Sequence, residues 1–544
     1  MRYPVESFTD AERAVLAPHV TSLDAPVFAL VGLPETVKGA LFARYSRWQG
    51  TLRRLFLDEF ADSLGDAERT PFDGAEGERA ARLYETIFLG YGDDSVAQLG
   101  GAHVACEWAS NVVTKILQRP RLAAYLEQST RYIPYDAPME EGAHPPRYRY
   151  YRDEELGGDG GEYARAMDRI FAIYSNALPR VVAWADERFP PPDGEPSAAH
   201  RRAIQAKALD LLRGLLPASS LSHMGIYATG QTYEQLILHL LAHPLPEARF
   251  YGRGILDAIK ATMPSFVSRV ERPDRGGEWI SYLEARERAA ERWVARLGLD
   301  RRAASADAGP AGAGGPSVRL LHVDGDEEAL LAALLFEAAG VDEETARLRL
   351  AALSADERTT LLRDLVGERA NRRHRPGRGL EALRYRFEIV SDYGAFRDLQ
   401  RHRMLTVQWQ RLTPDLGAGV PEEVDEAGVG DDYRRALDVS RQAYERLVDS
   451  GHDPRAATYA LCLGYRIRYV LDLNAREALA LIELRSGREG HPSYRAVAHE
   501  MHAQIAAVHP AVAAAMRHVD TESEPRLERI LAEMRTQAKL DARA

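Results

Sequence analysis

The sequence has few cysteines, no long apolar run and no excess of positive charge, and each shortage excludes a class of protein. Its 544 residues contain only Cys106 and Cys462, which excludes a disulfide framework, and no Cys-x-x-Cys pair is present to bind a metal. No apolar run approaches the ~20 residues that a membrane-spanning helix requires. The net charge of −11 argues against general binding to nucleic acid, although it permits a local basic pocket.

The start of the chain, MRYPVESFTDAERAVL, lacks the basic segment and apolar run of a secretory signal. Together with the few cysteines, this predicts a cytoplasmic protein without a membrane partner. The composition is ordinary for a globular protein, with 45% hydrophobic and 28% charged residues. Because single cores stop growing at about 250–300 residues, we expect more than one domain.

A segment rich in alanine, glycine and proline divides the chain near its middle. AASADAGPAGAGGPS (303–317) has no aromatic or large aliphatic side chain to anchor it, which predicts a flexible linker between domains at 1–302 and 318–544. A strand followed by an amphipathic helix is predicted at 27–47, and the same order recurs at 318–340. The two parts therefore begin alike.

Both parts also contain an arginine-rich segment. LQRPRLAAYLEQSTRY (117–132) and LQRHRMLTVQWQRLTP (399–414) begin with Leu-Gln-Arg-x-Arg and lie 282 residues apart. Ahead of the second segment, LRYRFEIV (383–390) alternates as a half-buried strand does. The repeated order predicts a tandem duplication. The alternative is that two α+β domains share an arginine-bearing helix end by coincidence.

The second arginine-rich segment, 394–403, is predicted to be a helix that leads into a loop. Arg401 and Arg403 cannot share a helix face, but they can splay around an anion once the chain leaves the helix. His402 can stack on a ring or donate to a ring carbonyl. This set suits a phosphate-bearing cofactor with a flat heterocycle. The alternative is a solvated cationic helix end.

The first arginine-rich segment offers a different group of side chains. Glu127, Ser129 and Arg131 alternate, so in an extended stretch they point the same way. A guanidinium and a hydroxyl suit a phosphate, and a carboxylate suits a sugar hydroxyl or a base N–H, so the group suits a nucleotide. The alternative is a surface strand with a weak Glu–Arg pair.

These two segments carry a resemblance to a known family. RPRLAAYLEQSTRY (119–132) resembles, without a gap, the signature R-H-R-x-x-S-x-N-E-x-S-x-R-Y of the flavin-dependent thymidylate synthases. RHRMLTVQWQRLTP (401–414) resembles its first half only. The first copy departs from the signature at Pro120, Ala124 and Leu126, and the second copy loses its closing residues, having Trp409, Arg411, Thr413 and Pro414 there.

Further family landmarks are divided between the two copies. The family's arginine four residues before a proline, which helps to bind substrate phosphate, is matched by Arg213. Its Asn-x-Arg followed nine residues later by an arginine, which binds flavin and polarises the pyrimidine, is matched by NAREALALIELR (474–485). Independently of the family, Asn474 and Glu477 predict a capping box for a helix at 475–485. Arg476 and Arg485 lie half a turn out of phase on that helix, so they should reach different partners.

The resemblance implies an α+β protein made of two tandem copies of a thymidylate synthase-like domain. Each copy would have a small curved mixed or antiparallel sheet with long helices. The implied catalytic residue is Arg485, which would stabilise negative charge on the uracil ring. The implied substrate-binding residues are Arg119, Glu127, Gln128, Ser129, Arg131 and Arg213. The implied flavin-binding residues are Ser95, Glu381, Arg401, His402, Arg403, Met404, Asn474 and Arg476, and no metal is implied.

The reaction implied by the resemblance is reductive methylation of dUMP at C5. FAD, NADPH and methylenetetrahydrofolate are the implied cofactors, and the family's tetramers imply a homodimer of this double chain, a pseudo-tetramer. Three alternatives stay open: a flavin-dependent methylase of another pyrimidine nucleotide, a non-catalytic flavin- or nucleotide-binding protein, and an RNA-binding protein. The acidic net charge counts against the last of these.

Overall fold

The structure is a computed structural model, and it describes most of the chain. The described residues are 3–4, 6–33, 35–45, 47–61, 97–98, 100–141, 144–191, 198–299 and 315–521. Ser95 and nearly all of the predicted linker at 303–317 lie outside these ranges, so the structure does not test those two predictions.

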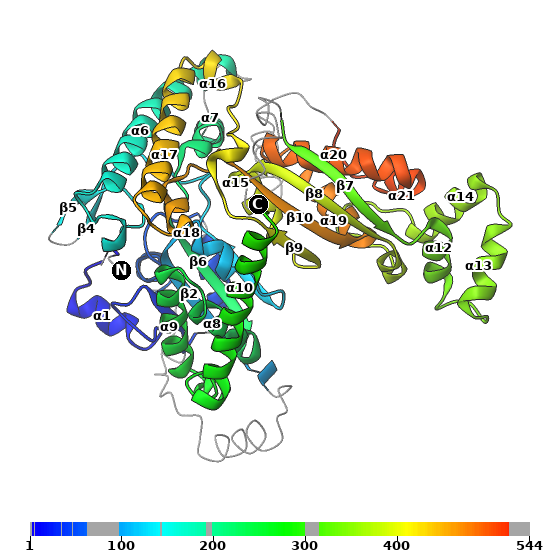
Figure 1. Cartoon of the computed structure of the whole chain (residues 1–544), viewed down its shortest axis with the longest axis horizontal. Coiled ribbons are helices and arrows are strands. Elements are labelled where there is room, and N and C mark those ends of the chain that lie inside the picture. The colour runs from blue at the N-terminus through cyan, green and yellow to red at the C-terminus, as the bar shows by residue number, and fades with distance from the viewer. Residues whose placement is uncertain are drawn as a thin grey trace. The chain divides into compact units, whose positions relative to one another are not determined.

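Two four-stranded antiparallel sheets organise the described residues (Figure 1). The strand order of the first sheet is β1-β2-β6-β3 and that of the second is β7-β8-β10-β9. Each sheet is therefore built in the same sequence of steps, and the prediction of an α+β protein is confirmed. The bounds are β1 Val27–Leu30, β2 Gly101–Ser110, β3 Ala123–Glu127, β6 Leu221–Thr229, β7 Ser317–Asp324, β8 Arg384–Asp392, β9 Leu405–Trp409 and β10 Arg466–Asn474.

Helices follow equivalent strands in the two sheets. The predicted strand–helix pairs near both starts are present, as β1 with α2 (Glu35–Tyr45) and β7 with α12 (Glu327–Leu335). Short helices α5 and α15 follow β2 and β8, and helix pairs α8–α9 and α19–α20 follow β6 and β10. The bounds are α5 Val113–Leu117, α8 Gly230–Leu241, α9 Pro246–Lys260, α15 Tyr393–Leu399, α19 Ala475–Arg485 and α20 Pro492–Val508.

The described residues form two compact units that do not coincide with the two sequence repeats. Unit 1 comprises Met1–Leu178, Leu215–Pro310 and Arg435–Cys462, and unit 2 comprises Pro179–Gly214, Ala311–Arg434 and Leu463–Ala544. Two of the boundaries fall inside long helices, α6 (Glu162–Arg188) and α17 (Gly430–Asp449). Each repeat thus contributes one segment to the unit built mainly from the other repeat. The domain limits 1–302 and 318–544 remain predictions about the repeats, because compactness alone divides the chain differently.

In unit 1 the sheet is covered on both faces. One face packs under α1 (Asp10–Leu16), α2 and α3 (Leu52–Glu59), whose apolar side chains form a cluster with those of β1. Helices α8 and α9 contact β6, β2 and β1 (Figure 1). As a result, every residue of β2 after Gly101 is buried. Unit 1 also contains β4 Met139–Glu141, β5 His144–Arg147, α10 Glu278–Arg296 and α18 Pro454–Ala457.

In unit 2 one sheet face packs against helices and the other face is polar. Burial alternates along β8, which confirms the predicted half-buried strand. Helices α19 and α20 contact the sheet, while the other face carries ion pairs such as Arg384–Asp472 at 2.9 Å and Arg468–Glu388 at 3.0 Å. The other helices of unit 2 are α7 Ala198–Leu212, α13 Glu343–Ala351, α14 Ala355–Val366, α16 Glu423–Glu426 and α21 Pro510–Ala515.

Both cysteines are free thiols in the interior, as the absence of a disulfide framework predicts. Burial raises the pKa of the Cys462 thiol to about 12, so neither thiol is placed to act as a nucleophile near neutral pH. Within the described ranges, none of the helices is both long enough and apolar enough to cross a bilayer.

Candidate functional site

The second arginine-rich segment leads from a helix into a loop, as predicted, but the helix ends at Leu399, before the predicted limit of 403. Asp392, the last residue of β8, caps α15 by accepting a hydrogen bond from Ala395 N at 2.8 Å. The helix ends at Leu399, and residues 400–404 form a loop before β9. Arg401, Arg403 and Met404 are exposed in this loop. The loop therefore presents two guanidinium groups and a thioether to ligands.

His402 turns inward between its exposed neighbours. Its side chain is only 9% exposed. Arg485 Nε donates to His402 Nε2 at 3.0 Å, so Nδ1 carries the hydrogen and donates to Glu477 Oε1 at 2.9 Å. Burial lowers the pKa of His402, although Glu477 opposes this effect. The imidazole is therefore held neutral and in one tautomer between a carboxylate and a guanidinium.

Arg485 is fixed from two sides. In addition to the contact with His402, its Cζ lies 5.5 Å from the centre of the Tyr494 ring. Burial lowers the pKa of this guanidinium, and the charge of Asp398 opposes the effect. Arg485 thus keeps one orientation, as a residue that stabilises charge on a substrate requires.

Asp398 joins two of the predicted phosphate-binding arginines. Arg213 Nη1 donates to Asp398 Oδ2 at 3.1 Å, and Arg401 Nη2 contacts the other oxygen of the same carboxylate. Arg213 is 3% exposed, and its Nη2 has no hydrogen-bond partner among the described residues. Asp392 Oδ1 lies 4.0 Å from that nitrogen. Unit 2 therefore contains a buried guanidinium N–H that a ligand could satisfy.

Asp392 is half-buried beside Arg213. Its Oδ2 accepts a hydrogen bond from Ser493 Oγ, at the start of α20. Burial raises the pKa of Asp392, and the positive charge of Arg213 opposes this shift. The carboxyl group therefore depends on Arg213 to stay ionised.

The start of α19 confirms part of the predicted capping box. Asn474 accepts a hydrogen bond from Glu477 N at 2.9 Å, as an N-cap does. The reciprocal half is wrong, because the Glu477 carboxylate binds His402 instead. Arg476 donates to Glu381 Oε1 at 3.3 Å and to the Pro376 carbonyl at 2.9 Å. Arg476 and Arg485 thus reach different partners, as their helical phase predicts.

In unit 1, Glu127 faces the interior. Lys115 Nζ donates to Glu127 Oε2 at 2.8 Å, and Gln118 Nε2 donates to the same oxygen at 3.1 Å. All three side chains are buried. The neighbouring Gln128 is also buried, where it donates to the Trp48 carbonyl at 2.6 Å and accepts from Arg149 at 2.9 Å.

The expected extended stretch through Ser129 and Arg131 is wrong. Strand β3 ends at Glu127, and the chain then turns, with Tyr132 N and Ile133 N both bonded to the Ser129 carbonyl. Ser129 Oγ accepts a hydrogen bond from Arg131 N at 3.3 Å, a local bond of the kind with which serine favours turns. Arg119 is exposed just beyond α5.

The structure thus gathers predicted residues of unit 2 into two groups, which include the neighbouring residues Arg401 and His402. Asp398 joins Arg213 and Arg401, and His402 joins Arg485 and Glu477. Sequence reasoning missed Asp392, Asp398, Glu477 as a histidine partner, and Ser493. Two signals were available for the aspartates: Asp392 stands where a strand gives way to a helix, and Asp398 lies three residues before Arg401, a spacing that pairs charges on a helix.

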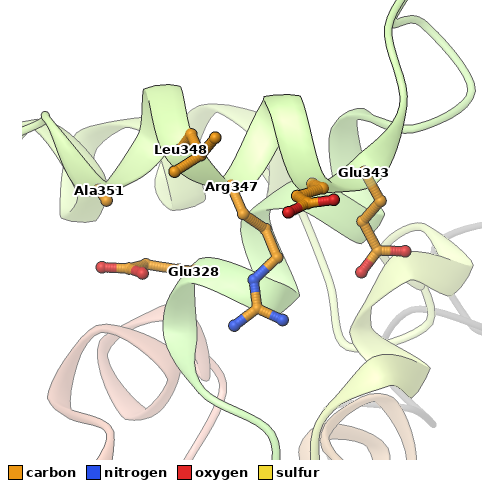
Figure 2. Close-up of a pocket in the computed structure, with 6 residues that line it drawn as sticks. Glu328, Glu343, Arg347, Leu348 and Ala351 are labelled. Carbon is orange, nitrogen blue, oxygen red and sulfur yellow. The ribbon is translucent and has the colours of Figure 1, made fainter.

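An open pocket elsewhere in unit 2 does not take part in either group. It has a volume of about 500 Å³ and lies between α12 and α13, where Figure 2 shows its lining. Three glutamates line it against one arginine, so it repels phosphate groups. The residues are Glu328, Glu343, Glu344, Arg347, Leu348 and Ala351. Among the described residues, no group of three or more His, Cys, Asp or Glu is arranged to hold a metal ion.

Three arginines and a histidine, each held by a carboxylate or by a neighbouring side chain, thus accompany an antiparallel sheet in an α+β protein. The model of the family "Thymidylate synthase complementing protein" matches residues 51–265 and 321–511. The chain belongs to this family. The first matched region contains β2, β3 and β6 of the first sheet, and the second contains β8, β9 and β10 of the second sheet with the end of β7.

The relatives of this chain match either nearly all of it or only a part of it. A "UPF0159 protein" of Chlamydia muridarum is 35% identical over 98% of this chain and 99% of its own length. A "Flavin-dependent thymidylate synthase" of Pyrococcus furiosus is 31% identical over 19% of this chain and 40% of its own length. The solved structure of a UMP/dUMP methylase from Streptomyces cacaoi bound with 5-Br dUMP is 20% identical, covers 38% of this chain and 97% of that chain, and has a TM-score of 0.31.

Proposed function

We propose that the protein is an FAD-dependent thymidylate synthase, which methylates dUMP at C5 to form dTMP with methylenetetrahydrofolate and NADPH. The observation that carries the proposal is the arrangement in unit 2 that joins Arg213 to Arg401 and Arg485 to His402. Membership in the thymidylate synthase complementing family supports it. The relatives named as flavin-dependent thymidylate synthase and as UMP/dUMP methylase agree with this chemistry.

The substrate phosphate would bind to Arg213, whose partner Asp398 also contacts Arg401, one of the proposed flavin-binding residues. Both guanidinium groups now contact Asp398, and Arg213 has a buried N–H to spare. A phosphate would therefore compete with Asp398 for the same donors. From the first copy, the proposed nucleotide contacts are those implied by the family resemblance: Arg119, Glu127, Gln128, Ser129 and Arg131. Of these, Glu127 would have to leave Lys115 in order to reach a ligand.

Arg485 would stabilise the negative charge that develops on the uracil ring. His402 accepts its Nε–H, and the Tyr494 ring lies against it, so the guanidinium needs no reorganisation when charge appears. Glu477 supports this arrangement indirectly, because it holds the histidine tautomer that accepts from Arg485.

The donors around the 400–404 loop fit a flavin dinucleotide. Arg401 and Arg403 are exposed and offer positive charge for a pyrophosphate. Met404, just before β9, offers an apolar, polarisable contact for a flat ring. Arg403, Met404, Asn474, Arg476 and Glu381 would hold it, together with Ser95 by family resemblance. Bound FAD would supply the hydride-transfer chemistry that the protein's own side chains lack.

The quaternary proposal follows from the duplication. We expect a cytoplasmic homodimer in which four copies of the ancestral unit assemble. Because the landmarks of substrate and flavin binding are divided between the copies, two active sites per dimer are expected. The molar ratio of bound FAD to chains would measure this: one FAD per chain agrees with the proposal, and two per chain contradict it.

The test of the activity uses the purified full chain. We expect a flavin absorption spectrum, oxidation of NADPH that dUMP stimulates, and formation of dTMP when methylenetetrahydrofolate is present. Rescue of a thymidine-requiring bacterium is the matching test in cells. A colourless protein that binds no added FAD would overturn the flavin assignment, and reduction without dTMP would leave a flavin protein of another activity.

A second candidate is a flavin-dependent C5 methylase of another pyrimidine nucleotide. The specific observation in its favour is Asp398, a carboxylate beside the proposed substrate-binding Arg213, combined with the departures at Pro120, Ala124 and Leu126. A comparison of UMP, dUMP and dCMP as substrates decides between the two. A flavin protein that methylates none of them would be the non-catalytic homologue.

A further inference from the structure

The strand β2 of unit 1 contains a bulge that its counterpart β8 lacks. The register against β6 shifts between Cys106 and Ala109, so Glu107 and Trp108 occupy the irregular positions. Trp108 has φ +60°, the only positive φ of a non-glycine residue in the described part of the chain. A bulky side chain adopts this backbone only where the surroundings require it, and bulges re-aim side chains near functional sites.

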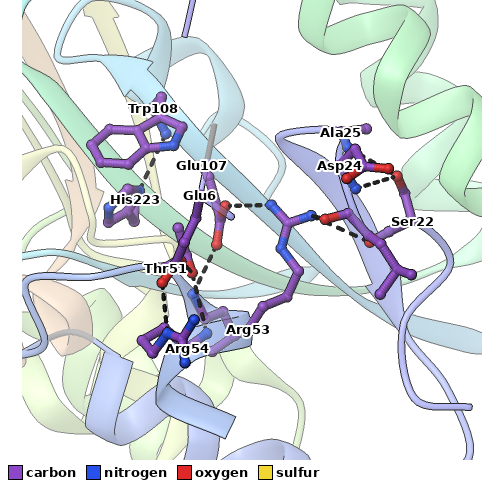
Figure 3. Close-up of polar contacts among 12 residues, drawn as sticks. Glu6, Ser22, Asp24, Ala25, Thr51, Arg53, Arg54, Glu107, Trp108 and His223 are labelled. Carbon is purple, nitrogen blue, oxygen red and sulfur yellow. Dashed lines mark hydrogen bonds and ion pairs between the residues drawn. The ribbon is translucent and has the colours of Figure 1, made fainter. Parts of the chain in front are cut away.

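The bulge directs Trp108 onto His223 of β6. Trp108 N donates to His223 Nδ1 at 3.2 Å, and the two rings meet edge to face with centres 4.4 Å apart (Figure 3). Because Nδ1 accepts, the hydrogen of the neutral imidazole lies on Nε2. His223 is fully buried, and Nε2 has no hydrogen-bond partner among the described residues. One buried donor is therefore unsatisfied.

Arg149 brings a second unsatisfied donor to the same tryptophan. Its Cζ lies 5.2 Å from the centre of the Trp108 ring and 4.8 Å from that of Tyr135. Nη2 donates to Gln128 Oε1, and Gln128 N donates in turn to the His223 carbonyl. Arg149 is 6% exposed, and its Nε has no hydrogen-bond partner among the described residues.

The charge of Arg149 is also unbalanced. Glu107 is buried in the same strand, but Arg53 Nη2 holds it at 3.0 Å, and Leu52 N donates to it at 2.8 Å (Figure 3). That pair is neutral by itself. No carboxylate among the described residues forms an ion pair with Arg149. A buried cation of this kind is costly unless an anion accompanies it.

We propose that Arg149 and His223 hold a small anion beside Trp108 in the interior of unit 1, either a free inorganic ion or the phosphate group of a larger ligand. The anion would accept hydrogen bonds from Arg149 Nε and His223 Nε2 and balance the guanidinium charge. Burial lowers the pKa of both side chains, and the charge of Arg149 further lowers that of His223. The imidazole therefore acts as a neutral donor and does not depend on protonation.

The corresponding place in unit 2 has no need of an anion. Gln410 N donates to the Arg468 carbonyl as Gln128 N donates to that of His223, so Arg468 takes the histidine's place. Arg468 is one-third exposed and pairs with Glu388 at 3.0 Å. Its charge is balanced by a side chain and by water. The proposed site is thus a property of the first repeat alone.

The experiment combines anion-dependent stability with diffraction from the wild-type chain. Thermal unfolding is followed at constant ionic strength as sodium bromide or sodium phosphate replaces a bulky organic salt. We expect a saturable rise of about 2–4 °C in the midpoint for the wild type. In Arg149→Gln this rise should disappear. Arg152→Gln is the matched control, because Arg152 lies on the same segment but has Asp159 and Asp168 within 3.8 Å. It should retain the full response.

Bromide diffraction keeps the proposal testable if Arg149→Gln does not fold. Wild-type crystals soaked in bromide should show an anomalous peak within hydrogen-bond distance of Arg149 Nε and His223 Nε2. A response to phosphate but not to bromide identifies a site for a phosphate group, and a higher affinity for a phosphate monoester than for inorganic phosphate assigns that group to a larger ligand. A response to bromide alone identifies a free halide. A water molecule at this position, with no saturable response to either salt, would overturn the proposal.

Discussion

The two sheets of this protein place the same pair of chemical groups at the same position but exchange their order. In unit 1, Ser110 ends β2 and donates to Glu247, the second residue of α9, at 2.7 Å. In unit 2, Asp392 ends β8 and accepts from Ser493, the second residue of α20. The hydrogen bond between a hydroxyl and a carboxyl group is kept. The carboxyl group lies on the helix in unit 1 and on the strand in unit 2.

The exchange alters what lies beside the carboxyl group. Glu247 accepts hydrogen bonds from the Tyr459 hydroxyl at 2.6 Å and from the hydroxyl and backbone N–H of Ser110, all of which are neutral donors. Asp392 lies 4.0 Å from Arg213. The first repeat uses this position to complete a core, whereas the second uses it to position a cation. Duplicated copies can therefore divide structural and chemical roles between them without a change in their hydrogen-bond pattern.

The largest effect that sharpens this comparison should come from Glu127. If unit 1 uses its carboxylates structurally, Glu127→Ala leaves Lys115 buried without its partner and should destabilise the protein by about 3–5 kcal/mol in chemical unfolding. Glu59→Ala removes one member of the exposed Arg44–Glu59 pair and should cost less than about 1 kcal/mol. Unchanged stability with weaker dUMP binding would instead make Glu127 a nucleotide ligand.

The next effect tests the chemical role of unit 2. Arg485→Ala should lower kcat by about 10²–10³-fold, because it removes a preorganised donor to developing charge. The matched control is Arg488→Ala, three residues further on, where the guanidinium is 41% exposed and pairs with Asp520. Steady-state dTMP formation measures both variants. Equal rates for the two would place the charge-stabilising group elsewhere.

A third effect depends on pH. Burial raises the pKa of Glu247 to about 7 in the folded protein, from an ordinary value of 4.5. The folded state therefore retains a proton that the unfolded state loses, so the contribution of Glu247 to stability is greatest below pH 4.5 and declines as the pH rises to 7. The decline attributable to this group is about 3 kcal/mol.

Glu247→Gln should abolish that decline, because an amide keeps hydrogen bonds without titrating. Urea unfolding at several pH values between 5 and 8 measures the slope. The carboxylates that act on Glu247 include Asp153, whose negative charge contributes to the raised pKa. The exposed Glu59→Gln variant should keep the wild-type slope. A slope that persists in Glu247→Gln would show that another group controls the pH dependence.

Local patterns allowed much of this fold to be predicted. The alternation of β8 and the cap at Asn474 depend on neighbours in sequence, and both are present. The helix predicted at 394–403 is present but ends earlier, at Leu399. Two errors also arose locally: Ser129 turns its own backbone, and Glu477 prefers a distant histidine to its reciprocal cap. In each case the side chain has two possible partners, and the spacing of residues in the sequence does not indicate which one it binds.

Features that depend on distant segments were not predictable. Leu-Gln-Arg at 117–119 aligns with Leu-Gln-Arg at 399–401, so Trp409 is the equivalent of Glu127 in the second repeat. The sequence does not show that Lys115 binds Glu127. The bulge at Trp108 depends on His223, more than a hundred residues away. The segments that the repeats exchange between the compact units follow from tertiary packing, since each begins within a continuous helix.

The smallest effect uses a matched pair of helix caps. Thr229 and Asn474 end equivalent strands, and each caps the next helix by accepting from the backbone three residues on. Replacement of either by alanine should cost about 1 kcal/mol of stability. The two variants differ in what else they should change. If Asn474 also contacts flavin, Asn474→Ala should weaken FAD binding in a fluorescence titration, whereas Thr229→Ala should not. Equal FAD affinity in the two variants would leave Asn474 with its capping role alone and move the flavin contact to the arginines of the 400–404 loop.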